Sequence, residues 1–385
     1  MEDTDRVRRR LEFVVKISKL CNLRCRYCYE LHDLHKKERM SLEDMRRMFT
    51  NIASYAAAEN YDLVQFIWHG GEPLLIKPSY YLEIAAIQRA IFEGICEVRN
   101  TVQTNLTVLT DDILELVGPG RFFGGLGVSF DPYGTDRVDT KGRLKDDQVI
   151  RNLQTLMDRD VPFGIVTVLS RGSLASAVNT FNCFDALGVN HRFLPYYMRA
   201  DDAQAADHSL TYEEIRDTYV ALVDAWLVSK NATVVDPIEE YMIYVWGILE
   251  DRKPHYFDAV ADEFIFIVEV DGGIWGVNGA YDPNEQYGNI FEESLRAVLS
   301  SQNRQRLLAE IEARKGRTCC QCEFYGHCSG KYVAHATQDE RHLLDTAGCL
   351  VRDLMGYIRT RFDETGLAAR QREPRQAESE RVTAL

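Results

Sequence analysis

The stretch Cys21-Asn-Leu-Arg-Cys25-Arg-Tyr-Cys28 carries three cysteines, separated by three and then two residues, directly after the apolar run 11–17. That run predicts a β-strand. Thiolates are the usual ligands of iron–sulfur clusters, and a four-iron cluster takes four ligands. Because the local set ends at three, one iron would stay open to a ligand from outside the chain. The alternative, buried or zinc-binding cysteines, fits less well because zinc prefers four ligands, commonly in paired C-x2-C units.

The composition excludes several classes of protein. The chain has 385 residues, 45 Lys and Arg against 59 Asp and Glu, and a net charge of -14, which argues against a nucleic-acid partner. No apolar run approaches the roughly 18 residues that a membrane span needs, and the first ten residues lack the apolar core of a secretion signal. We therefore expect a cytoplasmic protein with no membrane partner.

A second group of cysteines lies near the other end of the chain. Its spacing is Cys319-x2-Cys322-x5-Cys328, with Cys349 further on. Four thiolates are a full set for a second cluster with no open iron, and structural zinc is the alternative. Cys320 is either inert or a substitute for a neighbouring ligand. In a chain that is not secreted, where disulfides are not expected, cysteines grouped in this way indicate metal binding.

Strand-like and helix-like segments alternate over the first half of the chain. The predicted strands are 12–18, 63–69, 97–104, 125–129, 163–169 and 190–194. The predicted helices between them are 41–59, 80–92, 111–117, 145–159 and 173–187. This alternation predicts an α/β fold, a partial (β/α)6 TIM-like barrel in which loops after the strand ends form the working face. The three-cysteine loop follows the first strand and so lies on that face.

The ends of the later strands carry further candidate site residues. The second strand is followed by Gly70, Gly71, Glu72 and Pro73, where glycines allow backbone to approach a ligand closely. Polar residues at the ends of the third, fourth and fifth strands are further candidates: Asn105, Ser129, Asp131 and Arg171. They indicate a site less specifically, because such residues are also common in ordinary turns. We interpret His69 as a hydrogen-bonded histidine beside the sheet.

The rest of the chain predicts a second, smaller unit. Helices are expected over 211–229 and 237–252, a hairpin around Asp271-Gly272-Gly273, and one long helix over 292–314. The expected division is a barrel over 11–198, a helical insertion or bridge over 199–262, a small cluster-binding domain over 263–363 and a disordered tail over 364–385.

The first cysteine spacing, with Tyr27 before the last cysteine, resembles that of the radical SAM superfamily. The resemblance implies that the open iron of a 4Fe-4S cluster chelates S-adenosylmethionine. Gly70 to Pro73 resemble the element that holds the methionyl amine, and the stretches at Asn105, Ser129 and Asp131 resemble those that meet the ribose and carboxylate. Arg171 is a further candidate for that carboxylate.

The second cysteine group resembles the SPASM/twitch extension of radical SAM enzymes, which implies one auxiliary 4Fe-4S cluster on Cys319, Cys322, Cys328 and Cys349. Full SPASM proteins bind a second auxiliary cluster, but this chain has Asn278 and Tyr332 at two of its expected cysteine positions. We infer that this cluster is absent; the alternative is a misaligned hairpin. The stretches 19–25, 69–75 and 103–105 most resemble those of FxsB-type peptide-modifying enzymes.

The resemblance implies an oxidoreductase that forms a 5′-deoxyadenosyl radical, abstracts a substrate hydrogen atom, and cross-links or dehydrogenates a ribosomally synthesised peptide. A flavodoxin or ferredoxin would supply the electron. Because about ten residues precede the first strand, we expect no fused leader-binding domain. Alternatives are oxidation or epimerisation of a sugar or aminocyclitol, and a non-catalytic iron–sulfur or zinc protein. Sulfatase maturation ranks lower, because those enzymes follow the hairpin cysteine with an aspartate and Asn278 here precedes Gly279.

Overall fold

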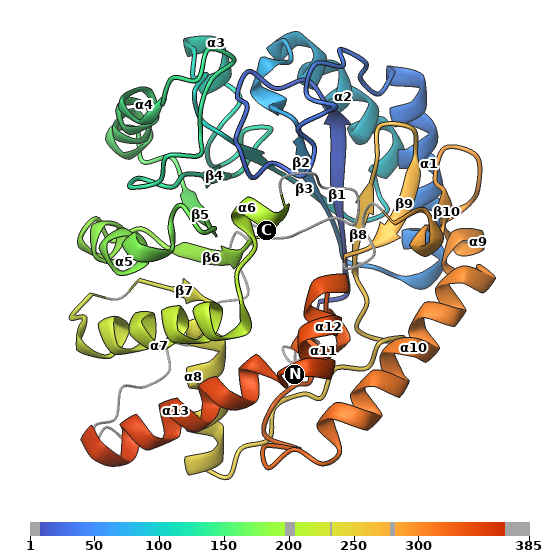
Figure 1. Ribbon diagram of the computed structural model, residues 1–385. Helices are drawn as coiled ribbons and strands as arrows, with labels where there is room; N and C mark the ends of the chain where they lie inside the picture. Colours follow the sequence, from blue (N-terminus) through green and yellow to red (C-terminus); the bar gives the residue numbers. More distant parts are fainter. Residues whose placement is uncertain (1–7, 197–204, 232, 278–281, 366–385) are drawn as a thin grey trace, which may run out of the picture.

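A single sheet in the order β10-β9-β8-β1-β2-β3-β4-β5-β6-β7 organises the molecule (Figure 1). The computed structural model describes residues 8–196, 205–231, 233–277 and 282–365. Strands β1 to β7 pair in parallel with their neighbours, and their bounds are β1 Arg10–Ser18, β2 Leu63–Gly70, β3 Glu97–Thr104, β4 Leu126–Ser129, β5 Phe163–Leu169, β6 His191–Pro195 and β7 Val235–Asp236. The predicted α/β barrel fold and its six strands are confirmed, and β7 is a short addition.

Strand β1 shows how the sequence builds this sheet. Its alternate residues Leu11, Phe13, Val15 and Ile17 belong to the main apolar core. Successive side chains point to opposite faces of a strand, so Glu12, Val14, Lys16 and Ser18 face the inside of the barrel. Val14 packs there against Ile67 of β2 and Ile267 of β8. Both faces of a central parallel strand are buried, so its side chains have to be apolar or, if they are charged, paired with an opposite charge inside the protein.

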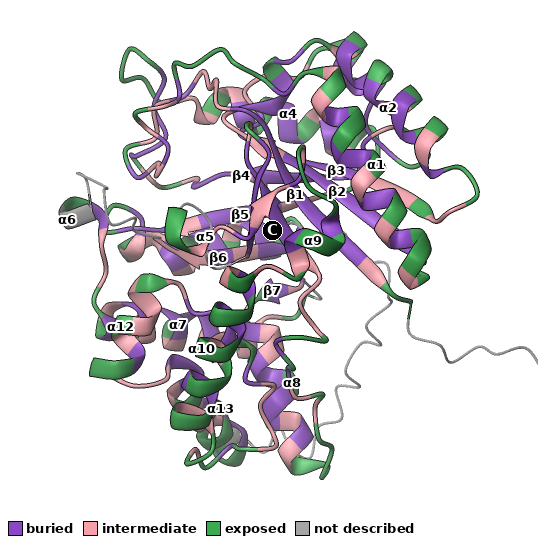
Figure 2. Cartoon of the chain, turned by 90° about the vertical axis from the view of Figure 1, so that its right-hand side faces the viewer, coloured by how far each residue is buried: buried purple, intermediate pink, exposed green. Residues whose placement is uncertain are grey.

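Helices cover the outer face of the barrel in the predicted order. Their bounds are α1 Leu42–Glu59, α2 Pro78–Phe92, α3 Asp111–Leu114, α4 Asp146–Asp158 and α5 Ala177–Ala186. The first begins where the sequence predicted, because Ser41 and Asp44 form a capping box at its N-terminus. Figure 2 shows these helices with buried faces toward the strands and exposed faces outward.

The C-terminal part joins the sheet rather than forming a sheet of its own. The predicted hairpin is β8 Ile265–Val268 and β9 Gly273–Gly276, extended by β10 Gly288–Asn289. Strand β8 pairs in parallel with β1, Val14 lying opposite Ile267. The single helix predicted over 292–314 is wrong: the structure has α9 Leu295–Leu299 and α10 Gln302–Cys319. Ser301 interrupts the run because its side chain accepts the Arg304 N–H and caps α10.

A second apolar core lies between the late strands and the C-terminal helices. It is built mainly by α7 Tyr212–Val228, α8 Ile238–Leu249 and α13 Leu350–Thr365. Three short helices complete the described fold: α6 Ala205–His208, α11 Lys331–Ala334 and α12 Gln338–Thr346. In Figure 1, α11 and α12 approach the sheet below β1. The predicted domain boundaries stay predictions.

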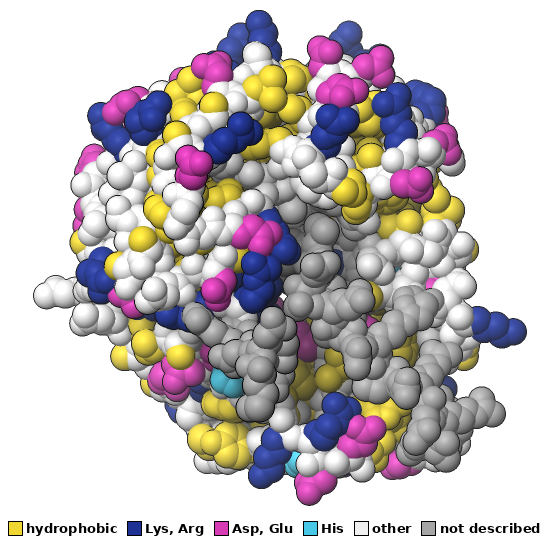
Figure 3. Space-filling model, turned by 180° about the vertical axis from the view of Figure 1, so that it is seen from behind, with side chains coloured by type: hydrophobic (Ala, Val, Ile, Leu, Met, Phe, Trp, Pro, Cys, Tyr) yellow, Lys and Arg dark blue, Asp and Glu magenta, His cyan; other side chains and the backbone are white. Residues whose placement is uncertain are grey.

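The surface is of mixed charge. Basic and acidic side chains are intermingled on the face seen in Figure 3. Within the described part of the chain, no helix has the length and apolar character that a membrane span requires. Most of the tail predicted to be disordered, from residue 366 on, lies outside the described residues.

Candidate active site

The first cysteine loop is held in place by the glycines that follow β2. A Cβ atom on Gly70 would lie 2.2 Å from the carbonyl oxygen of Ser18, and one on Gly71 would lie 2.3 Å from those of Lys19 and Leu20. Gly70 also has a φ of +109°, in the region that favours glycine. The chain entering the loop at Cys21 therefore lies directly on the backbone after β2, with no room for side chains between them.

Glu72 links the same segment to the end of β3. Its buried carboxylate accepts hydrogen bonds from Thr104 Oγ1 at 2.7 Å, Asn105 N at 2.6 Å and Leu74 N at 2.9 Å. Burial raises the pKa of Glu72, and these three donors partly offset that. Since the carboxylate is occupied by internal bonds, it acts as a tie between strand ends.

Polar groups and burial surround the three sulfur atoms. The Cys21 sulfur accepts hydrogen bonds from Leu23 N at 3.4 Å and from Asn105 Nδ2 at 3.6 Å. Burial raises the pKa of Cys21 and of Cys28 to about 12, and it also raises that of Cys25. A desolvated thiolate is costly unless a cation compensates it, and bound iron ions are such cations. The donor set thus fits a cluster.

Tyr27 lies at the centre of a buried polar group. Its hydroxyl donates to Asp131 Oδ2 and accepts a hydrogen bond from Arg137 at 2.9 Å. The other oxygen of Asp131 accepts the Val168 N–H of β5 at 3.0 Å. Sequence reasoning missed Arg137, because a single arginine in a loop carries no local pattern. Burial opposes the charged form of Arg137, but Tyr27, Cys25 and Asp131 outweigh it and raise its pKa.

The structure also places the remaining predicted residues. Ser129 Oγ accepts a hydrogen bond from Gln103 at 2.9 Å, at the mouth of β4. Pro73 is buried and opens a short 3-10 turn. Arg171 lies apart from these groups: it donates to Ser209 O at 2.7 Å and pairs with Glu214 of α7 at 3.2 Å. His69 accepts the Gly70 N–H at 2.7 Å, and burial lowers its pKa to about 3, as a neutral hydrogen-bonded histidine requires.

The second cysteine group converges on one cavity. Cys319 ends α10, Cys349 precedes α13, and both line a cavity of about 680 Å³ together with Cys322 and Cys328. Cys320 is exposed and is not part of this lining. Burial raises the pKa of Cys328 to about 12 and that of Cys349 to about 11. The four predicted ligands therefore line one cavity, and the fifth cysteine is exposed outside that lining.

The cysteine geometry also bears on what this cavity could hold. Cys328 accepts the Gly330 N–H at 3.5 Å, and Cys349 accepts backbone N–H groups of Val351 and Arg352 at the start of α13. Across the described ranges, no three His, Cys, Asp or Glu side chains come together as ligands of one metal ion. In a 4Fe-4S cluster each thiolate binds a different iron, so its ligands need not meet at one point.

A third feature lies between the two cysteine groups. A cavity of about 590 Å³ extends from Tyr29, the residue after Cys28, to Cys328, and seven tyrosines contribute to its lining. Cys328, Tyr332 and Val351 line both this cavity and the one that holds the second cysteine group. Its volume is in the range of small-molecule and side-chain sites. We call it the central cavity.

This chain is similar to known proteins in sequence. Residues 15–176 match the model of the Radical SAM superfamily. A serine-type anaerobic sulfatase-maturating enzyme from Klebsiella pneumoniae is 24% identical over 335 residues, covering 83% of this chain and 80% of its own. A cysteine-type anaerobic sulfatase-maturating enzyme from Clostridium novyi (strain NT) is 22% identical over 324 residues, covering 80% of this chain and 83% of its own.

A solved structure described as native anSMEcpe with bound AdoMet and Cp18Cys peptide superposes with a TM-score of 0.71 at 17% identity, covering 94% of this chain and 99% of the other. Residues 15–176 are thus a radical SAM domain, and the chain is homologous to anaerobic sulfatase-maturating enzymes. The radical SAM domain makes this protein a redox enzyme whose cofactors are S-adenosylmethionine and 4Fe-4S clusters.

These findings confirm the predicted superfamily, fold class and cofactors. The resemblance to FxsB-type enzymes and the count of one auxiliary cluster stay predictions. Asn278 and Gly279, the two residues that speak against sulfatase maturation, lie outside the described residues.

Proposed function

We propose that this enzyme oxidatively modifies a peptide in the central cavity, with one auxiliary cluster on Cys319, Cys322, Cys328 and Cys349 as the electron acceptor. The sulfatase-maturating relatives, together with the peptide bound in the anSMEcpe structure, support a peptide substrate. The observation that carries the proposal is the position of the central cavity, which begins beside the first cysteine loop and shares Cys328 with the second group.

The first cysteine loop would hold the radical-forming cofactors. When bound, the cluster and S-adenosylmethionine supply a 5′-deoxyadenosyl radical that takes a hydrogen atom from the substrate and leaves as 5′-deoxyadenosine. Cys21, Cys25 and Cys28 are the three protein ligands in this proposal. The tie from Glu72 to β3 and the bonds of Tyr27 to Asp131 and Arg137 keep the loop in register with the barrel mouth.

Net oxidation needs a second step. After hydrogen abstraction the substrate radical must lose one electron and one proton to give a stable oxidised product, whether or not a new bond forms in the same step. Tyr332 and Val351 line both the central cavity and the cavity of the four cysteines, so a cluster held by those cysteines would lie beside the substrate and could accept this electron. Whether the product is a cross-link, a dehydrogenated residue or an aldehyde depends on the substrate.

Two adjacent cysteines provide a matched experiment. The reconstituted enzyme would be given S-adenosylmethionine, dithionite and a peptide encoded beside its gene, and both 5′-deoxyadenosine and modified peptide would be measured. We expect Cys319→Ala to stop peptide modification while 5′-deoxyadenosine is still formed, and Cys320→Ala to behave like the wild type. Equal loss of both products in Cys319→Ala would show a merely structural cluster. Turnover of a sugar or aminocyclitol, with none of any peptide, would favour the small-molecule alternative.

A further inference from the structure

Arg192 of β6 is a cation inside the central cavity with no partner among the described residues. Its strand neighbour His191 packs against Phe181 and Phe184 of α5, with ring centroids 5.6 Å apart in each pair. Because side chains alternate along a strand, Arg192 points to the opposite, inner face, where it lines the cavity. Its Nε is buried without a hydrogen bond, and the guanidinium makes no ion pair with any residue that the structure describes.

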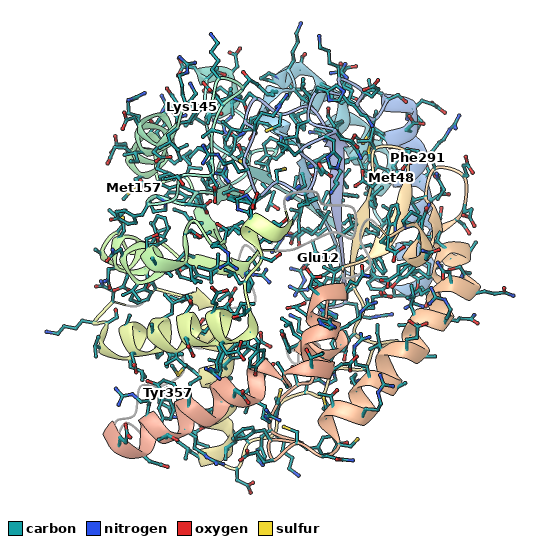
Figure 4. All side chains as sticks on the ribbon, viewed as in Figure 1. Glu12, Met48, Lys145, Met157, Phe291 and Tyr357 are labelled. Carbon is teal, nitrogen blue, oxygen red and sulfur yellow. The ribbon has the colours of Figure 1, made fainter. Side chains whose placement is uncertain are left out.

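Lys331 of α11 adds a second cation to the same lining. Its ammonium likewise forms no ion pair within the described ranges. Figure 4 shows Glu12 on the lower part of β1, near the approach of α12. Burial raises the pKa of Glu12, and Arg10 and, to a smaller extent, Lys331 partly offset this effect. The ion pair of Glu12 is with Arg10, at 3.2 Å.

The carboxylates of the cavity wall, by contrast, are already engaged. Glu240 accepts a hydrogen bond from the hydroxyl of Tyr244. Glu340 accepts the Thr337 N–H at 2.8 Å as part of the cap of α12. Asp339 also has an interaction partner. Burial lowers the pKa of His335 to about 3, so this lining residue is neutral. Among the described residues, these carboxylates therefore form no ion pair with Arg192 or Lys331, and both cations stay available to an anionic group of a ligand.

We infer that the central cavity binds a carboxylate of the peptide, an Asp or Glu side chain or a free C-terminus, through Arg192 with Lys331 as a second cation. This inference rests on the proposed function. A half-buried guanidinium without acceptors is costly, and a substrate carboxylate removes that cost while accepting two parallel N–H bonds. The planar fork of arginine fixes the orientation of such a group, so Arg192 would set which neighbouring residue meets the radical.

Binding to defined peptide pools tests this directly. The reconstituted full chain with S-adenosylmethionine would be mixed with N-acetylated octapeptides whose flanking positions are randomised among uncharged residues. One pool has a fixed Glu and an amidated C-terminus, a second has Gln and an amide, and a third has Gln and a free C-terminal carboxylate. We expect at least one carboxylate pool to be retained about tenfold more than the Gln amide pool, as a charge-assisted bond implies. The preferred pool identifies the source of the carboxylate.

Variants then assign the preference to this site. Arg192→Gln should abolish it, and Arg46→Gln, on the exposed side of α1, should leave it intact. Lys331 is exposed, so Lys331→Gln should fold, and we expect it to reduce the preference for the carboxylate pool several-fold. If Arg192→Gln does not fold, Lys331→Gln is the variant that tests the inference. Equal retention of all pools by the wild type, or an unchanged preference in Arg192→Gln or Lys331→Gln, would overturn the inference. Binding needs no turnover, so this result is separate from failure of the proposed reaction.

Discussion

Replacing Gly71 with alanine perturbs the contact that positions the first cysteine loop. The added Cβ would lie 2.3 Å from two backbone carbonyl oxygens, those of Lys19 and Leu20, whereas ordinary van der Waals contact begins at 3.4 Å. The loop must therefore move by about 1 Å, because neither atom belongs to a side chain that can rotate away. A shift of about 1 Å at a reacting centre costs on the order of 100-fold in rate. Overpacking of this kind also costs about 1–3 kcal/mol of folding free energy.

The assay is 5′-deoxyadenosine formation by the reconstituted enzyme, with iron content and the denaturation midpoint measured on the same sample. We expect Gly71→Ala to lose about 100-fold in rate or to lose the first cluster, and to keep the iron of the second group. Gly356→Ala is the control, since nothing lies within 4 Å of its added Cβ and it lies inside α13. Wild-type rate and iron content in Gly71→Ala would refute the role given to this contact.

Three further outcomes follow from the same site. Replacing all three cysteines of the first group with alanine should leave about four of about eight irons per chain; about eight remaining would show a further cluster. Tyr27→Phe should lower the free energy of unfolding by about 1–3 kcal/mol in denaturant titrations, because it leaves buried Asp131 and Arg137 without a shared partner, and Tyr133→Phe, which is 53% exposed, should not. Since burial lowers the pKa of His69 to about 3, the unfolded chain binds the extra proton below pH 6.5. This group alone should therefore lower the free energy of unfolding by about 2 kcal/mol from pH 7 to pH 5, beside a similar contribution from His335. A His69→Gln variant with the same pH dependence would contradict that assignment.

Local sequence patterns predicted the barrel well because its strands are apolar and its helices are capped. The bounds predicted for the strands at 97–104 and 163–169 agree with β3 and β5, and the capping box at Ser41 marks the start of α1. The prediction of one long helix over 292–314 was wrong because of a similar capping signal. Ser301, inside the amphipathic run, caps a new helix and so separates it from the one before.

Contacts between distant segments could not be predicted in this way. The pairing of β8 with β1 joins residues about 250 positions apart, and no local pattern encodes it. The roles of Glu72 and Asp131 as ties between strand ends, and the presence of Arg137 beside Tyr27, likewise depend on how loops meet in space. Arg171 was a candidate because it ends β5, but its side chain turns to α7.

The most direct test of the account is cleavage of S-adenosylmethionine by the reconstituted enzyme under strictly anaerobic conditions with dithionite. We predict that the wild-type chain forms 5′-deoxyadenosine and that Cys25→Ala, which lacks one of three proposed ligands, forms none above background. No 5′-deoxyadenosine from a wild-type sample containing the expected iron, or equal amounts from wild type and Cys25→Ala, would contradict the central claim that this loop holds the radical-forming cluster.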